Sequence, residues 1–188
     1  VELGTDESAR VLARAGRGSL RIHLERWNDA IVVLMRAEGD AASARAPGET
    51  MADILADQGV AWSAMRQNAR AVEVLKRAVD VGPTNTRAAY NLAVALREMR
   101  CNEEAIAALR RVLALDERHA DANVLMARAL VESGRLREAI GCMVRALGQR
   151  LADPDIIMGT ILLLRQLDAS ADERIASVLR QAETSSGD

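Results

Sequence analysis

The sequence contains no phenylalanine and only one tyrosine, Tyr90, in its 188 residues. Aromatic and β-branched residues are enriched in strands, and here the β-branched residues occur only in short runs. Alanine, leucine, arginine and glutamate, which favour helices, are abundant instead. The composition therefore predicts an all-α fold.

The chain is also poor in the residues that carry most enzyme chemistry. Its two histidines, His23 and His119, lie far apart in the sequence, and no catalytic motif includes either of them. Its two cysteines, Cys101 and Cys142, form neither a CxxC pair nor a cluster with histidine, so we expect no disulfide framework and no metal site. These absences predict a protein that is not an enzyme and that needs no cofactor.

Charge and hydropathy exclude two further classes of partner. The formal net charge is −2 with mixed signs, which offers no general attraction to nucleic acid or to an anionic membrane. The longest apolar stretch, 156–164, is interrupted and much shorter than the roughly 20 residues that cross a bilayer. No membrane span is expected. We expect a cytoplasmic location, or a periplasmic one if a leader preceding Val1 was removed.

What the sequence does contain is a repeat. Ala71, Ala105 and Ala139 recur at one constant interval in similar surroundings. Small residues at fixed positions let helices approach closely, and large apolar residues fill the gaps where helices cross. The resulting 34-residue period predicts stacked helical hairpins. Four more series share the register: Gly59, Ala93 and Ala127; Trp62, Leu96 and Leu130; Leu75, Leu109 and Met143; and Ala78, Val112 and Ala146.

This register resembles the tetratricopeptide repeat (TPR). In that family the first helix of each hairpin, helix A, has a small residue at position 8 and a large one at 11, and helix B has small residues at 20 and 27. With Ala52 as position 1, clear repeats cover 52–85, 86–119 and 120–153. The resemblance implies one TPR-like domain, 1–188, folded as a right-handed α-solenoid of about five stacked helical hairpins.

A divergent repeat is predicted at each end of the clear ones. The first covers 11–44, with Gly18 at position 8 and Ala30 at position 20. The glycines of the string AGRGS are assigned to this helix, because a phosphate loop would need a preceding strand and a GK[ST] ending. The last unit is a capping hairpin over 154–184. Its first helix is predicted to begin after Asp153, and a capping box of Ser170 and Glu173 predicts its second.

The resemblance also implies a ligand groove, because helix A of a TPR faces a bound peptide with positions 2, 5, 6, 9, 12 and 13. Here these positions combine an apolar strip with flanking arginines, although neighbouring helices that partly bury the valines would explain the strip as well. Tyr90 would anchor a ligand, and Asn91 resembles an asparagine that holds the ligand backbone in many TPRs. The other predicted groove residues are Val60, Val94, Val124, Met158 and Leu162 in the strip, and Arg87, Arg97, Arg128 and Arg165 beside it.

These observations favour an adaptor that binds a protein or peptide in the groove, with apolar contacts for affinity and arginines that select acidic flanks. One TPR subclass clamps the carboxylate ends of chaperones, but Ala56, Val60 and Leu125 stand where that clamp needs lysine, asparagine and a cation. Two alternatives stay open. In the first, the chain is a scaffold that self-associates through its divergent first repeat or through residues 156–167. In the second, it is the targeting or regulatory region of a larger enzyme.

Overall fold

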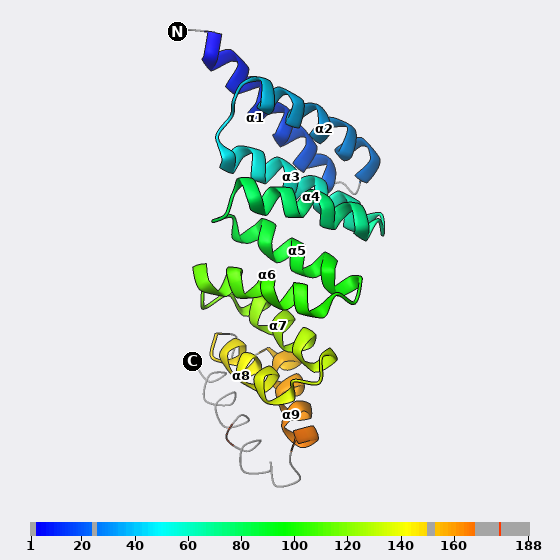
Figure 1. The fold of residues 1–188 in the computed structure, drawn as a ribbon, viewed down its shortest axis with the longest axis vertical. Coiled ribbons are helices and arrows are strands. Elements are labelled where there is room, and N and C mark those ends of the chain that lie inside the picture. The colour runs from blue at the N-terminus through cyan, green and yellow to red at the C-terminus, as the bar shows by residue number, and fades with distance from the viewer. Residues whose placement is uncertain (1–2, 24–25, 150–152, 168–176, 178–188) are drawn as a thin grey trace. The chain divides into compact units, whose positions relative to one another are not determined.

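A computed structural model describes residues 3–23, 26–149, 153–167 and Ser177. In this part of the chain it contains nine α-helices and no strand (Figure 1). The predicted all-α fold is therefore confirmed. The chain divides into two compact units, Val1–Cys101 (unit 1) and Asn102–Asp188 (unit 2), and each has its own packing of helices.

Within each unit, each helix packs on the next one in the sequence, and in unit 1 α3 also contacts both α1 and α5. These alternate contacts bring the first helices of successive hairpins side by side. The helices of unit 1 are α1 (Leu3–His23), α2 (Trp27–Ser43), α3 (Gly48–Ala64), α4 (Asn68–Val81) and α5 (Thr86–Glu98). Those of unit 2 are α6 (Asn102–Leu115), α7 (Ala120–Glu132), α8 (Leu136–Leu147) and α9 (Pro154–Leu167).

The residues that set the 34-residue register are core residues. Ala71 in unit 1, and Ala105 and Ala139 in unit 2, have no exposed surface. Gly59 of α3 lies against Leu75 of α4, and a Cβ atom at Gly59 would overlap the Leu75 side chain. The small and large positions therefore pack helix against helix, as the sequence predicted.

Gly18 has the same packing role between α1 and α2. A Cβ atom there would lie 2.5 Å from the side chain of Leu34, whereas a Cβ atom at Gly16 would meet nothing within 4 Å. Both glycines lie inside α1, so the string AGRGS is helical and forms no phosphate-binding turn.

The residues that cap the N-termini of the helices also recur with the 34-residue period. Asn85, His119 and Asp153 occupy the same position in successive repeats and directly precede α5, α7 and α9. Each side chain accepts a hydrogen bond from the backbone N–H three residues further on, at 2.8, 3.2 and 3.4 Å respectively. The predicted start of α9 is thus confirmed. The helix predicted from Ser170 and Glu173 lies outside the described residues.

The turns within the hairpins repeat as well. Arg66, Arg100 and Gly134 follow the same period, and their φ angles are 60°, 62° and 75°. Glycine adopts this left-handed region without steric cost, while other residues bring Cβ too close to the following carbonyl oxygen. Two of these three turns therefore hold an arginine where the backbone favours glycine.

Candidate functional site

In each unit a pocket lies on the face formed by the first helices of the hairpins. A pocket of about 570 Å³ lies among α1, α3 and α5, and we call it the α1–α3–α5 pocket. A second, of about 450 Å³, lies between α7 and α9, with α8 contributing Met143, and we call it the α7–α9 pocket. Predicted groove residues line both pockets: Val60, Arg87 and Asn91 in the first, and Val124, Arg128 and Leu162 in the second.

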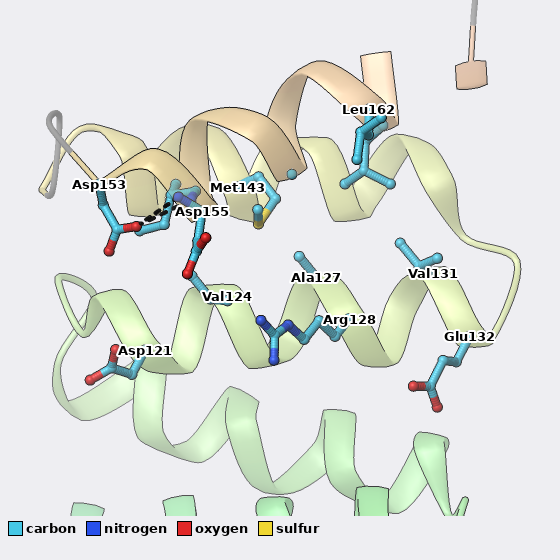
Figure 2. Close-up of a pocket in the computed structure, with 13 residues that line it drawn as sticks. Asp121, Val124, Ala127, Arg128, Val131, Glu132, Met143, Asp153, Asp155 and Leu162 are labelled. Atoms are coloured by element: carbon cyan, nitrogen blue, oxygen red, sulfur yellow. Dashed lines mark hydrogen bonds between the residues drawn. The ribbon is translucent and has the colours of Figure 1, made fainter. Parts of the chain in front are cut away.

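The α7–α9 pocket has apolar walls (Figure 2). Val124 and Val131 come from α7, and Leu162 from α9 is 56% exposed. Gly159 lets α9 lie close to Met143 of α8, because a Cβ atom there would lie 2.6 Å from the Met143 Cε atom. An exposed leucine beside a concave apolar surface is typical of a surface that contacts another molecule.

Charged side chains surround these apolar walls. Figure 2 shows Asp121, Asp153 and Asp155 at the end where α7 and α9 begin, Arg128 midway along α7 and Glu132 near its end. One carboxylate oxygen of Asp153 accepts the hydrogen bonds that cap α9. The pocket therefore presents four carboxylates and one guanidinium around an apolar centre.

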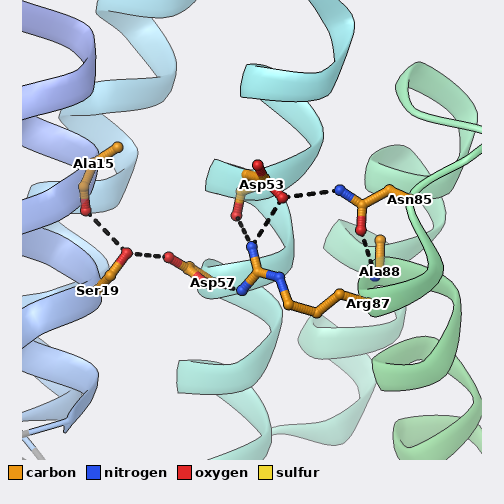
Figure 3. Close-up of polar contacts among 7 residues, drawn as sticks. All are labelled: Ala15, Ser19, Asp53, Asp57, Asn85, Arg87 and Ala88. Carbon is orange, nitrogen blue, oxygen red and sulfur yellow. Dashed lines mark hydrogen bonds and ion pairs between the residues drawn. The ribbon is translucent and has the colours of Figure 1, made fainter.

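The α1–α3–α5 pocket is lined by polar side chains that bond to one another (Figure 3). Arg87 of α5 forms ion pairs with Asp57 and Asp53 of α3, the second at 3.1 Å. Ser19 of α1 donates a hydrogen bond to the other carboxylate oxygen of Asp57. Partial burial alone would lower the pKa of Arg87, but the hydrogen bonds and charges of Asp57 and Asp53 outweigh it and raise that pKa. Asp57 thus links three helices of unit 1, because it accepts from Ser19 of α1 and from Arg87 of α5.

Five predicted groove residues line neither pocket. They are Tyr90, Val94 and Arg97 on α5, all partly buried, and Met158 and Arg165 on α9, both exposed. Arg97 also donates to a carboxylate oxygen of Glu98 at 2.8 Å. The pockets therefore gather six of the eleven predicted residues and do not include the other five.

Two positions that the resemblance places in the groove are buried instead. Ala56 is 0% exposed and Leu125 is 6% exposed. Neither side chain is available to a ligand, so the face that a ligand could reach is narrower than the sequence predicted. The sequence also did not identify Asp57 as a partner of Arg87, or Ser19 as a partner of Asp57. The sequence held one signal of this cluster. Asp53 and Asp57 are four residues apart, and residues at that spacing lie next to each other on one face of a helix.

Other kinds of site find no support in the described residues. They contain no group of three or more histidine, cysteine, aspartate or glutamate side chains that could hold a metal ion. Cys101 and Cys142 are free thiols. No helix among the described segments has the length and apolar character to cross a membrane.

Comparison with known proteins places these features in a family. Residues 100–158 match the family described as tetratricopeptide repeat. Residues 100–158 are therefore a TPR segment. No curated protein sequence matches it.

Solved structures resemble this chain over most of its length. The structure of MamA protein shares 20% identity, covers 92% of this chain and 89% of its own, and gives a TM-score of 0.73. A double mutant of MamA RS-1 shares 17% identity, with 95% and 97% covered and a TM-score of 0.75. YrrB, described as a TPR protein with an unusual peptide-binding site, shares 18% identity, with 90% and 82% covered and a TM-score of 0.71. These likenesses confirm the helical-repeat fold class.

Proposed function

We propose that this TPR chain is a non-enzymatic adaptor that binds a protein or peptide segment on the helix faces that form its pockets. The observation that carries the proposal is the α7–α9 pocket, where apolar side chains that a soluble surface would normally cover stay open to solvent. Helical repeats present such concave surfaces to protein partners. The description of YrrB as a TPR protein with a peptide-binding site supports the same class of ligand.

The predicted groove residues have different proposed roles, depending on whether they line a pocket. Val124, Arg128 and Leu162 form the centre of the site in unit 2, and Val60 and Asn91 contribute in unit 1. Arg87 acts indirectly in this proposal, because its ion pairs with Asp53 and Asp57 join α5 to α3. The remaining predicted residues would contact flanking parts of a ligand: Tyr90, Val94, Arg97, Met158 and Arg165.

The arginines give little support to the prediction that the ligand has acidic residues beside its apolar part. Arg87 and Arg97 each bond to carboxylates of the chain itself, which neutralises much of their charge. Arg128 is exposed, but it lies among carboxylates in the α7–α9 pocket. The proposal therefore rests on apolar contact, and the charge of the ligand is a separate question.

Affinity capture from native lysate tests the proposal. Wild type is compared with Val124→Asp and Leu162→Asp, which place a charge in the pocket, and with Val144→Asp, whose exposed side chain in the same unit lies outside both pockets. We expect the two pocket variants to lose the partner and the Val144→Asp variant to retain it, with equal thermal unfolding as the test of folding. Undiminished capture by both pocket variants would place the binding site elsewhere.

A self-associating scaffold is the second candidate, and one observation favours it. The first two helices expose large apolar side chains: Leu12 (62%), Leu20 (57%), Val32 (52%) and Met35 (57%). Contact with a second copy would cover these side chains. Light scattering over a dilution series tests this candidate, with Met35→Asp expected to shift the mass toward the monomer. A wild-type chain that is monomeric at every concentration would exclude it.

A further inference from the structure

The charges around the α7–α9 pocket point to a ligand opposite in sign to the one predicted from the arginines. Asp121, Glu132, Asp153 and Asp155 contribute four carboxylates, and Arg128 contributes the one cation among the lining residues. The apolar walls lie between these charges (Figure 2). A ligand that contacts these apolar walls therefore also lies close to the four carboxylates, which we call the negative rim.

Helix capping explains only part of this negative charge. Asp153 caps α9, and aspartates near a helix N-terminus are stabilised by a helix dipole equivalent to about half a positive charge. That half charge does not offset the two carboxylates of Asp153 and Asp155 at this end of the pocket. Asp155 is exposed, and no ion pair joins it to another described residue. The negative potential at this end is therefore open to a ligand.

We propose that the α7–α9 pocket binds an amphipathic peptide segment with apolar side chains against Val124, Val131 and Leu162 and lysine or arginine residues beside Asp153 and Asp155. Complementary charges at an interface determine which partner binds and in which orientation, while apolar contact supplies most of the affinity. This inference rests on the proposed peptide-binding function and names the chemistry of its ligand.

Two labelled synthetic peptides, each long enough to span the pocket, test the inference when their binding to the whole chain is measured by fluorescence anisotropy. Both have the same leucine and alanine positions, and the polar positions near the ends are lysine in one peptide and glutamate in the other. We expect the lysine peptide to bind at least about tenfold more tightly than the glutamate peptide at low salt. The difference should shrink as salt rises, because solvent-exposed charges are screened.

Charge reversal at the rim gives the matched comparison. Asp155→Lys should weaken binding of the lysine peptide by about fivefold and strengthen binding of the glutamate peptide. Glu117→Lys introduces the same change at an exposed carboxylate of unit 2 that does not line the pocket, and it should leave both affinities unchanged. Leu162→Asp should remove binding of both peptides, while Leu115→Asp, at an exposed leucine outside the pocket, should not.

The possible failures are distinguishable. Equal affinity for the two peptides, or tighter binding of the glutamate peptide, would overturn the charge assignment but would leave a peptide groove in place if Leu162→Asp still abolishes binding. No binding of either peptide to folded wild type would overturn the inference, and the capture experiment would then decide the adaptor function by itself. Binding that survives Leu162→Asp would contradict both the inference and the proposed site.

Discussion

Arg87 on α5 and Asp57 on α3 form an ion pair across one face of unit 1 (Figure 3). The Asp57 side chain is only 12% exposed, and its second oxygen accepts the hydroxyl of Ser19 from α1. Both oxygens of this nearly buried carboxylate are thus satisfied by residues of other helices. The arginine that the sequence assigned to a ligand therefore joins α5 to α3, and Asp57 joins α1 to the same cluster.

We expect Arg87→Ala to lower the free energy of unfolding by about 1–3 kcal/mol, because it leaves a nearly buried carboxylate without its cation. Urea unfolding followed by circular dichroism measures this change. Arg128→Ala is the control, since Arg128 forms no ion pair with another described residue, and it should change stability by less than about 0.5 kcal/mol. Equal effects of the two variants would show that the Arg87 ion pair contributes nothing to stability.

Gly18 and Gly16 offer a matched pair within α1. Gly18→Ala should destabilise the chain by about 1–3 kcal/mol, because the new Cβ atom would overlap the buried Leu34 side chain. Gly16→Ala should stabilise it by about 0.5–1 kcal/mol, because alanine favours the helix and the added methyl group meets open space. Thermal unfolding of the two variants tests the prediction, which fails if the two changes have the same sign.

Arg66 occupies a left-handed backbone position at the end of α3. Arg66→Gly should raise the free energy of unfolding by about 0.5–1 kcal/mol, because glycine removes the steric cost of a Cβ atom at positive φ. The substitution also removes a long, exposed ion pair of 3.9 Å with Glu98, which contributes little. Arg66→Ala removes the same ion pair but keeps the Cβ atom, so it should not stabilise the chain. Equal denaturation midpoints for Arg66→Gly and Arg66→Ala would contradict this account.

The two thiols should react at different rates. Cys142 is 3% exposed, and burial raises the pKa of its thiol, which outweighs the nearby Arg145 that lowers it. Cys101 is partly exposed in the turn after α5. Iodoacetamide at pH 8 should therefore modify the Cys142→Ser variant, which retains Cys101, much faster than the Cys101→Ser variant. Unfolding in urea should equalise the rates, and a fast reaction of folded Cys101→Ser would contradict the prediction.

The helix register could be predicted because it depends on neighbours along the chain. Ala71, Ala105 and Ala139 are small where two helices cross, and the same crossing recurs in each hairpin, so the period is visible in the residues themselves. The groove could be predicted only in outline. Ala56 and Leu125 were assigned to the ligand face and are buried, because neighbouring helices cover them, and the extent of that cover does not follow from a residue's position in its own repeat.

The sequence by itself determined the all-α class, the 34-residue register and the capped start of α9, since helix propensity, capping and small-to-large alternation are local properties. The tertiary structure decided which charges are used internally and where an apolar surface stays open. Arg87 meets Asp57 across 30 residues of sequence, and Gly159 leaves room for Met143 of another helix. These relationships depend on the distance between helices after packing, and that distance is a property of the folded chain.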